Sequence, residues 1–288
     1  MIAKIRKLEY RLINGLFEKL DKKFIRRSLN IKNIPSAKFR RGGKASLIEW
    51  SHVIGIFQAL IGLNLPKKGS EKTLILDIGC GTGLLALASE PHLIDNGQYI
   101  GIDVMEKDIA FCRKHYHKPY FKFIHHDLFN PTYSEHQRKE KTKWDIEQNS
   151  ADLVTALSVW THLNEEDAIF YFKEIDRVLK PGGKAIITFF LLDSDYYQRS
   201  YPLRKDQASR YHNTKQTKWI FGVNAYGSGN WFTTKWAKHA EDAIAITSEG
   251  LDKMLSGLNM DLITLYPGNW REASGLYFQD ILVFQKKE

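Results

Sequence analysis

Short apolar runs alternate with helical runs along most of the chain. The apolar runs are rich in Ile, Leu, Val and Phe, as expected for strands that are buried on both faces of a parallel sheet. The strands expected on this basis are residues 73–78, 98–103, 121–126, 151–157, 184–190, 261–266 and 280–284. The helical runs cover residues 46–63, 84–89, 106–118, 165–179 and 248–258. This alternation predicts an α/β fold with a doubly wound, Rossmann-like sheet.

Two segments interrupt the alternation. Residues 131–149 are polar and poorly periodic, which predicts a surface loop that can form part of a pocket rim. Residues 191–245 hold ten aromatic side chains among polar and basic ones. Because they follow the fifth strand at the end of the sheet where ligands bind, we expect an insertion that serves as a lid or substrate-recognition segment. The alternative is a packed cap without ligand contacts.

The first 45 residues have a different pattern. Apolar residues at positions 5, 8, 12, 16 and 20 recur at helical spacing, and fourteen Lys and Arg stand against three acidic residues. The net charge of this segment, +11, exceeds the +9 of the whole chain. We therefore expect a basic amphipathic helical arm over residues 1–45 and one α/β domain over residues 46–288. The apolar stripe either packs on the domain or lies on an anionic membrane surface or polyanion.

The remaining composition is ordinary for a globular protein. Cys80 and Cys112 lie far apart and form no disulfide or metal-ligand framework, so we expect a reducing compartment and no metal. No apolar run approaches the length of a membrane span, and no signal peptide is visible. The expected location is the cytoplasm, with a peripheral membrane contact through residues 1–30 as the alternative.

The most informative stretch follows the first expected strand. Gly79, Gly81 and Gly83 stand at alternate positions, with Asp77 just before them and a helical run just after. Glycines permit a sharp turn and a close ligand approach, and the helix supplies N–H donors, although glycine clusters also occur in plain turns. The dinucleotide fingerprint G-x-G-x-x-G would need glycine at position 84, where this chain has leucine. The spacing therefore disfavours an NAD-dependent dehydrogenase.

A carboxylate ends the second expected strand. Asp103 lies twenty residues beyond Gly83, near the separation at which an acid meets a ribose in Rossmann-type folds. We expect it to accept hydrogen bonds from both ribose hydroxyls. The alternative is a helix N-cap.

Several motifs together resemble class I S-adenosylmethionine-dependent methyltransferases. They are the glycine turn after Asp77, the Arg-Val-Leu-Lys-Pro-Gly-Gly run at 177–183, Ser-Val-Trp-Thr-His at 158–162, Phe-Phe-Leu-Leu at 189–192, Gly268 with Trp270, and Gln-Asp-Ile-Leu-Val at 279–283. The last four are similar to a bacterial subgroup with a Ser-Val-aromatic-Thr-His motif after strand four. The chain departs from that subgroup at Leu84, often arginine, and at Arg41-Gly-Gly-Lys44, often Gly-Gly-Gly-Asp.

The resemblance implies a seven-stranded sheet whose last strand is antiparallel, and S-adenosyl-L-methionine as the cofactor. It places the glycine turn and Asp77 at the methionine and ribose end. Asp127, followed by Leu128, would face the adenine, although an acid after a strand is also a common cap.

The strand-four motif leads to a hypothesis for the reaction. His162 is the candidate base for a hydroxyl acceptor on a small molecule or glycan, and a structural histidine is the alternative. Trp160, Thr161, Trp270 and Arg271 are candidate substrate contacts. An Asp/Asn-Pro-Pro-aromatic motif is missing after strand four, which argues against nucleic acid as the acceptor. The rival hypothesis is a catalytically weak protein of the same fold that binds membranes or polyanions through its arm.

Overall fold

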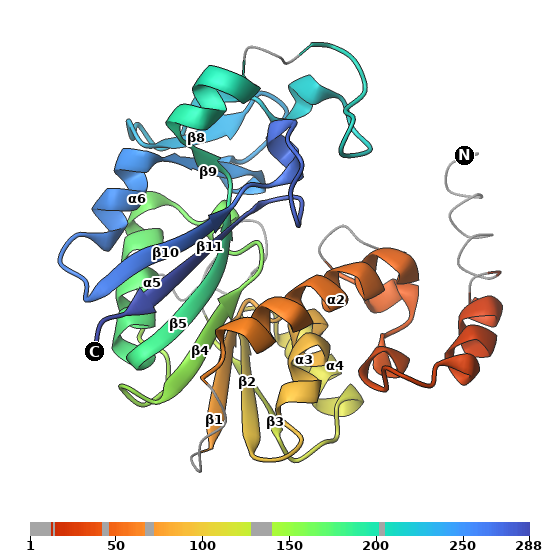
Figure 1. The fold of residues 1–288 in the computed structure, drawn as a ribbon. Coiled ribbons are helices and arrows are strands. Elements are labelled where there is room, and N and C mark those ends of the chain that lie inside the picture. The colour runs from red at the N-terminus through yellow and green to blue at the C-terminus, as the bar shows by residue number, and fades with distance from the viewer. Residues whose placement is uncertain (1–12, 14, 42–45, 67–71, 128–139, 202–204) are drawn as a thin grey trace.

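A computed structural model describes residues 13, 15–41, 46–66, 72–127, 140–201 and 205–288. Its centre is a seven-stranded sheet (Figure 1). In spatial order the strands are β10 (Met260–Tyr266), β11 (Asp280–Lys286), β5 (Leu179–Phe189), β4 (Ala151–Ala156), β1 (Thr73–Ile78), β2 (Gly97–Asp103) and β3 (Phe121–His125). The pairs from β5 to β3 are parallel, and β11 runs antiparallel to both of its neighbours. The predicted sheet with an antiparallel last strand is confirmed.

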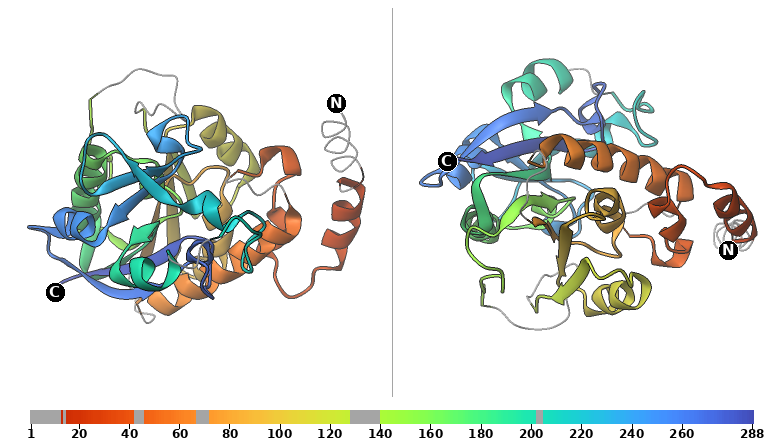
Figure 2. Two further views of the ribbon diagram at one scale, coloured as in Figure 1. Left: turned by 90° about the horizontal axis from the view of Figure 1, so that it is seen from above. Right: turned by 60° about the horizontal axis from the view of Figure 1, so that its bottom comes forward.

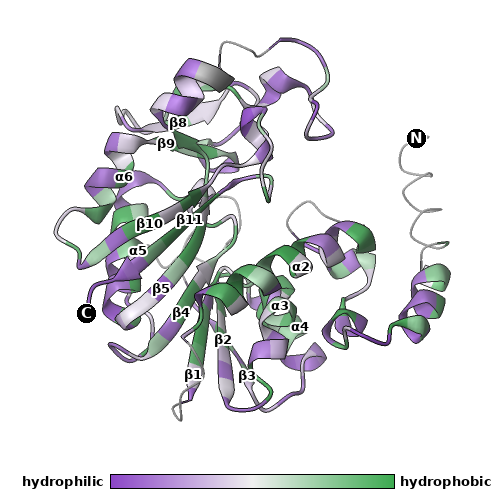
Figure 3. Ribbon diagram, in the orientation of Figure 1, coloured by the Kyte–Doolittle hydropathy of each residue, from purple (hydrophilic) through white to green (hydrophobic). Residues whose placement is uncertain are grey.

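Helices cover both faces of this sheet because its strands are apolar on both sides. Ile75 of β1 packs with α2 (Leu47–Asn64), α3 (Leu84–Ser89) and α4 (Glu106–His115). The next residue, Leu76, points to the opposite face and packs in the cluster that holds α5 (Glu165–Val178) and α6 (Ser248–Leu255). Figure 3 shows apolar residues concentrated in the central strands and in α2.

Two elements differ from the sequence-based expectation. Strand β5 begins at Leu179, because the Pro-Gly-Gly turn is absorbed as an irregularity in its pairing with β4. Helix α2 is, within the described residues, the one helix long and apolar enough to span a membrane, contrary to the expectation that no such run exists. Six of its side chains, from Trp50 to Ile61, are buried against the domain, so we interpret α2 as a core helix.

The aromatic-rich segment after β5 forms most of a second sheet. Its strands, in spatial order, are β6 (Leu191–Leu192), β9 (Ile244–Thr247), β8 (Trp231–Thr234) and β7 (Phe221–Asn224). A separate apolar cluster beside it includes Phe190, Tyr196, Phe221 and Trp270. Figure 1 shows β8 and β9 beyond the carboxyl ends of the central strands, where they adjoin the ligand-binding edge.

Short elements lead from the arm into the domain. Residues 15–24 are helical and are followed by η1 (Asn30–Asn33) and η2 (Ala37–Phe39). Phe39 stacks on Phe111 of α4, and its carbonyl oxygen accepts a hydrogen bond of 2.6 Å from the Thr82 hydroxyl. The arm therefore ends beside the glycine turn. Figure 2 shows the helical part of the arm at the outer edge of the molecule in both views.

Candidate functional site

The glycine turn after β1 depends on backbone conformations that favour glycine. Gly79, Gly81 and Gly83 have φ angles of +69°, +50° and +87°. A Cβ at Gly79 would lie 2.4 Å from Val159 Cγ2, and one at Gly83 would lie 2.4 Å from Tyr116 Cε2. At Gly81 the nearest atom would be Arg41 Cβ, 3.8 Å away. The turn is thus packed at its two ends and open at its middle, as a ligand cradle requires.

Asp103 holds this turn against β2. Its Oδ2 accepts a hydrogen bond of 2.7 Å from the Gly81 N–H, and its Oδ1 accepts one of 2.8 Å from the Met105 N–H. Burial raises the pKa of Asp103, while these two N–H donors favour the carboxylate and oppose the rise. Because each carboxylate oxygen has a second lone pair, Asp103 can also accept hydrogen bonds from a diol in the cavity beside it.

Asp77 lies beneath the turn and connects three strands. Its Oδ2 accepts a hydrogen bond of 2.6 Å from the Tyr99 hydroxyl on β2, and its Oδ1 accepts one of 2.8 Å from the Thr155 hydroxyl on β4. Burial raises the pKa of Asp77 to about 7, despite these two donors. Asp77 also lines the larger cavity described below, so it combines a structural role with a place at the site.

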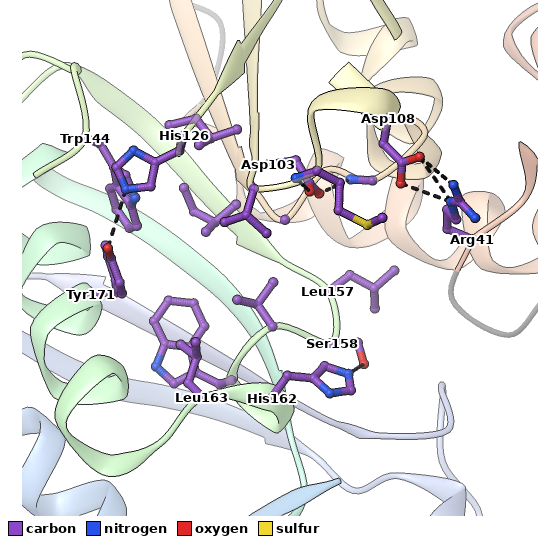
Figure 4. A pocket seen from close by; sticks show the side chains of 18 residues that line it. Arg41, Asp103, Asp108, His126, Trp144, Leu157, Ser158, His162, Leu163 and Tyr171 are labelled. Carbon is purple, nitrogen blue, oxygen red and sulfur yellow. Dashed lines mark hydrogen bonds and ion pairs between the residues drawn. The ribbon is translucent and has the colours of Figure 1, made fainter. Parts of the chain in front are cut away.

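A cavity of about 270 Å³ opens beside the turn (Figure 4). Its walls are mostly apolar, and Asp103 is on one of them. The apolar or aromatic lining residues are Ile78, Ile102, Val104, Met105, Trp144, Leu157, Val159, Trp160, Leu163 and Tyr171. A mostly apolar cavity with a carboxylate on its wall suits a nucleoside, because the base packs between apolar walls and the sugar hydroxyls meet the acid.

Two pairs of residues close the ends of this cavity. At one end Arg41 makes a bidentate ion pair with Asp108, with an Nη2–Oδ1 distance of 2.8 Å. At the other end Trp144 stacks on Tyr171 with ring centroids 5.5 Å apart. Figure 4 shows the first pair and the labelled side chains of His126, Trp144 and Tyr171 at opposite ends.

At the end of β3, the residue that lines the cavity is not the predicted adenine contact, Asp127. Asp127 is exposed just after β3, and His126 lines the cavity in its place. Leu128 lies outside the described residues.

His162 stands where the first cavity meets a second one, and it lines both. Its Nδ1 lies 2.6 Å from the Glu241 carbonyl oxygen. Since a carbonyl oxygen only accepts hydrogen bonds, Nδ1 carries the proton and Nε2 has the lone pair. Burial lowers the pKa of His162, so the imidazole is neutral near pH 7. This is the tautomer and charge that a general base needs.

Ser158 lies beside that lone pair. Its hydroxyl lies 3.5 Å from His162 Nε2 and accepts a hydrogen bond of 2.9 Å from Gln279 Nε2. Thr188 donates to Gln279 Oε1 at 2.7 Å and accepts from the Ser158 N–H at 2.7 Å. Ser158 has a φ of +62°, a costly conformation for this residue type that these bonds hold in place. The loop after β4 is therefore fixed by β5 and by the residue before β11.

The second cavity is larger, about 770 Å³. It extends from the glycine turn and α2 to the residues around the second sheet and the loop before β11. Its aromatic lining residues are Trp50, Phe190, Tyr211, Trp219, Tyr277 and Phe278, and its charged or titratable ones include Glu49, His52, His212, Lys218 and Asp242. The inserted segment thus contributes side chains to a pocket that adjoins His162.

The other predicted substrate contacts separate into two groups. Trp160 lines the smaller cavity and Thr161 the larger one, although both side chains are almost fully buried. Trp270 and Arg271 are buried away from the lining of these two cavities. Arg271 Nε lies 3.0 Å from Asp280 Oδ1, and its Nη1 lies 3.1 Å from Asp193. We therefore assign Trp270 and Arg271 a structural role.

Sequence reasoning missed several lining residues. Val104 and Met105 could have been inferred from their place directly after Asp103 at a strand end. Trp144 falls in the loop expected at the surface, yet it is buried against Tyr171. Arg41 and Asp108 are 67 residues apart, so their ion pair could not be predicted from the spacing of residues in the sequence.

Comparisons with known proteins agree with this geometry. Residues 75–183 match a family model described as a methyltransferase domain. A crystal structure of a protein from Pyrococcus horikoshii OT3 is 17% identical, with 83% of this chain and 92% of that chain covered and a TM-score of 0.52. A crystal structure of an S-adenosylmethionine-dependent methyltransferase from Mesorhizobium loti is 15% identical, with 79% and 96% covered and a TM-score of 0.52. At these identities the two structures establish a shared fold.

Proposed function

We propose that the protein transfers a methyl group from S-adenosylmethionine to a hydroxyl of a small molecule or glycan. The match of residues 75–183 to a methyltransferase-domain model and the fold shared with the two solved structures support this proposal. The observation that carries the proposal is the position of His162. A neutral histidine with its lone pair on Nε2 stands between a nucleoside-sized cavity and a larger aromatic one.

The residues present fit the cofactor. Gly81 leaves space where a side chain would otherwise stand, and Asp103 has acceptor capacity toward the smaller cavity. The apolar walls around Met105 and Leu157 would hold the adenine, and Asp103 would hold the ribose hydroxyls. When bound, the cofactor supplies a methyl group already activated by its sulfonium sulfur. The remaining tasks of the protein are to align a nucleophile and to remove its proton.

The larger cavity suits the acceptor. Its volume and aromatic walls match a ring-shaped substrate, because sugar and aromatic rings both stack on faces such as those of Tyr211 and Trp219. A hydroxyl is a weak nucleophile at neutral pH until its proton is removed, and His162 Nε2 is the group placed to accept that proton. The Glu241 carbonyl oxygen would stabilise the imidazolium that forms, through the Nδ1–H bond.

The test is a methyl-transfer assay with a panel of phenols, sugars and glycans, compared with amines and thiols. In His162→Asn the side-chain amide can still donate to the Glu241 carbonyl, while the base at Nε2 is removed. We expect turnover to fall about 10²- to 10⁴-fold, with unchanged cofactor affinity. In the wild type the rate should fall only below the lowered pKa of His162. Turnover restricted to amines or thiols, or full turnover in His162→Asn, would contradict the proposal.

A further inference from the structure

The helix at residues 15–24 has its polar side toward the domain. Glu18 forms an ion pair of 2.6 Å with Arg40, whose side chain is fully buried. One turn further along, Lys22 donates a hydrogen bond of 2.5 Å to the Ile34 carbonyl oxygen. These contacts fix the rotation of the helix about its axis, because Glu18 and Lys22 are four residues apart and lie on one face.

The apolar side of the same helix faces outward. The exposed fractions are 59% for Ile13, 64% for Leu16, 63% for Phe17, 47% for Leu20 and 74% for Phe24. At about 100° per residue these five positions fall within an arc of about 100°, on the side away from Glu18 and Lys22. An amphipathic helix of a globular protein normally packs this stripe on its core. Here the arrangement is inverted.

Basic side chains flank the exposed stripe. Lys19 and Lys23 are exposed along one of its edges, and Arg26 and Arg27 are exposed just after the helix. In the sequence, the preceding twelve residues continue both features, with Lys4, Arg6, Lys7 and Arg11 among apolar positions of the same period. Figures 1 and 2 show the helix as the outermost element on its side, and Figure 3 shows apolar and polar residues side by side along it.

From this inverted helix we infer an anionic membrane surface as the partner of the arm, bound through the face formed by Ile13, Leu16, Phe17, Leu20 and Phe24. Apolar side chains enter the acyl boundary of such a surface while lysines and arginines meet the lipid phosphates. A second copy of the chain fits less well, because pairing two identical faces would bring the cations of both copies together. The inference goes beyond methyl transfer and does not depend on it.

The test is flotation of the full chain with phosphatidylcholine vesicles, with and without phosphatidylglycerol. We expect binding to the mixed vesicles, and a loss of about tenfold for each apolar side chain removed in Phe17→Glu/Leu20→Glu. Removing the charges in Lys19→Gln/Lys23→Gln should weaken binding to the mixed vesicles about fivefold for each lysine. Added salt should also weaken this binding.

The matched control adds the same two charges elsewhere. Leu63 and Ile94 are also exposed, at 76% and 67%, so Leu63→Glu/Ile94→Glu should float like the wild type. Circular dichroism and thermal melting verify that all variants fold, as expected for exposed positions. Failure of the wild type to float, or equal flotation of Phe17→Glu/Leu20→Glu, would overturn the inference. So would a wild-type dimer in sedimentation that this variant abolishes, because the face would then join two copies.

Discussion

The buried carboxyl of Asp77 makes the stability of this fold depend on pH in a direction that can be worked out. Burial raises its pKa from 3.8 to about 7. A carboxyl whose pKa is higher in the folded than in the unfolded protein makes its full contribution to stability below pH 3.8, where it is protonated in both. That contribution is lost as pH rises to about 7, because the unfolded chain ionises first.

The size of the loss follows from the two pKa values. The interval from 3.8 to about 7 spans about three pH units, and each unit corresponds to about 1.4 kcal/mol. The free energy of unfolding should therefore lose about 4 kcal/mol from this group between about pH 4 and pH 8. In Asp77→Asn the charge is removed, and the hydroxyls of Tyr99 and Thr155 can rotate to suit an amide.

The assay is urea denaturation of the wild type and Asp77→Asn at a series of pH values. The difference in unfolding free energy, variant minus wild type, should rise by about 4 kcal/mol from pH 4 to pH 8. Taking the difference cancels other groups that titrate in both proteins. Asp145→Asn is the matched control because Asp145 is exposed. A difference for Asp77→Asn that stays constant within about 1 kcal/mol would refute the reasoning.

Two further predictions concern stability and are measured by the same denaturation assay. Gly83→Ala should lower the free energy of unfolding by more than about 2 kcal/mol, since a positive φ and a contact of 2.4 Å with Tyr116 act together. Gly227→Ala should lower it by about 1 kcal/mol, because Gly227 also has a positive φ, +70°, but a Cβ there would meet nothing within 4 Å. Equal losses would contradict the packing argument. Arg271→Met should lower the free energy of unfolding by about 3–5 kcal/mol, because it leaves the Asp280 carboxylate buried without its cationic partner, and a loss below about 1 kcal/mol would argue against the structural role.

Much of the fold could be predicted because its signals are local. The apolar runs, the helices between them and the glycine turn each extend over fewer than twenty residues, and all are found near the predicted positions. The number of strands and the antiparallel direction of β11 came instead from the family resemblance, and the order of the strands was not predicted. The second sheet was not foreseen, since its short strands do not follow a clear period of two.

The site was harder to predict because its contacts span long distances in sequence. Asp103 and the glycine turn could be located from strand ends, and the structure joins them by the bond from the Gly81 N–H. For Arg271, by contrast, the sequence pattern was misleading. A cation in a loop before the last strand has the sequence pattern of a binding residue, yet its partner Asp193 lies 78 residues away and the Arg271 side chain is buried. Only the fold shows that Asp103 lines a cavity whereas Arg271 is buried in ion pairs.

The central claim is that the cavity beside Asp103 binds S-adenosylmethionine. It is tested most directly by calorimetric titration of the purified protein with S-adenosylmethionine, S-adenosylhomocysteine and NAD. We predict binding of the first two but not of NAD, and a loss of affinity of at least about tenfold in Asp103→Asn, where the charge that meets the ribose hydroxyls is removed. Binding of NAD alone, or of none of the three by a folded protein, would contradict the account.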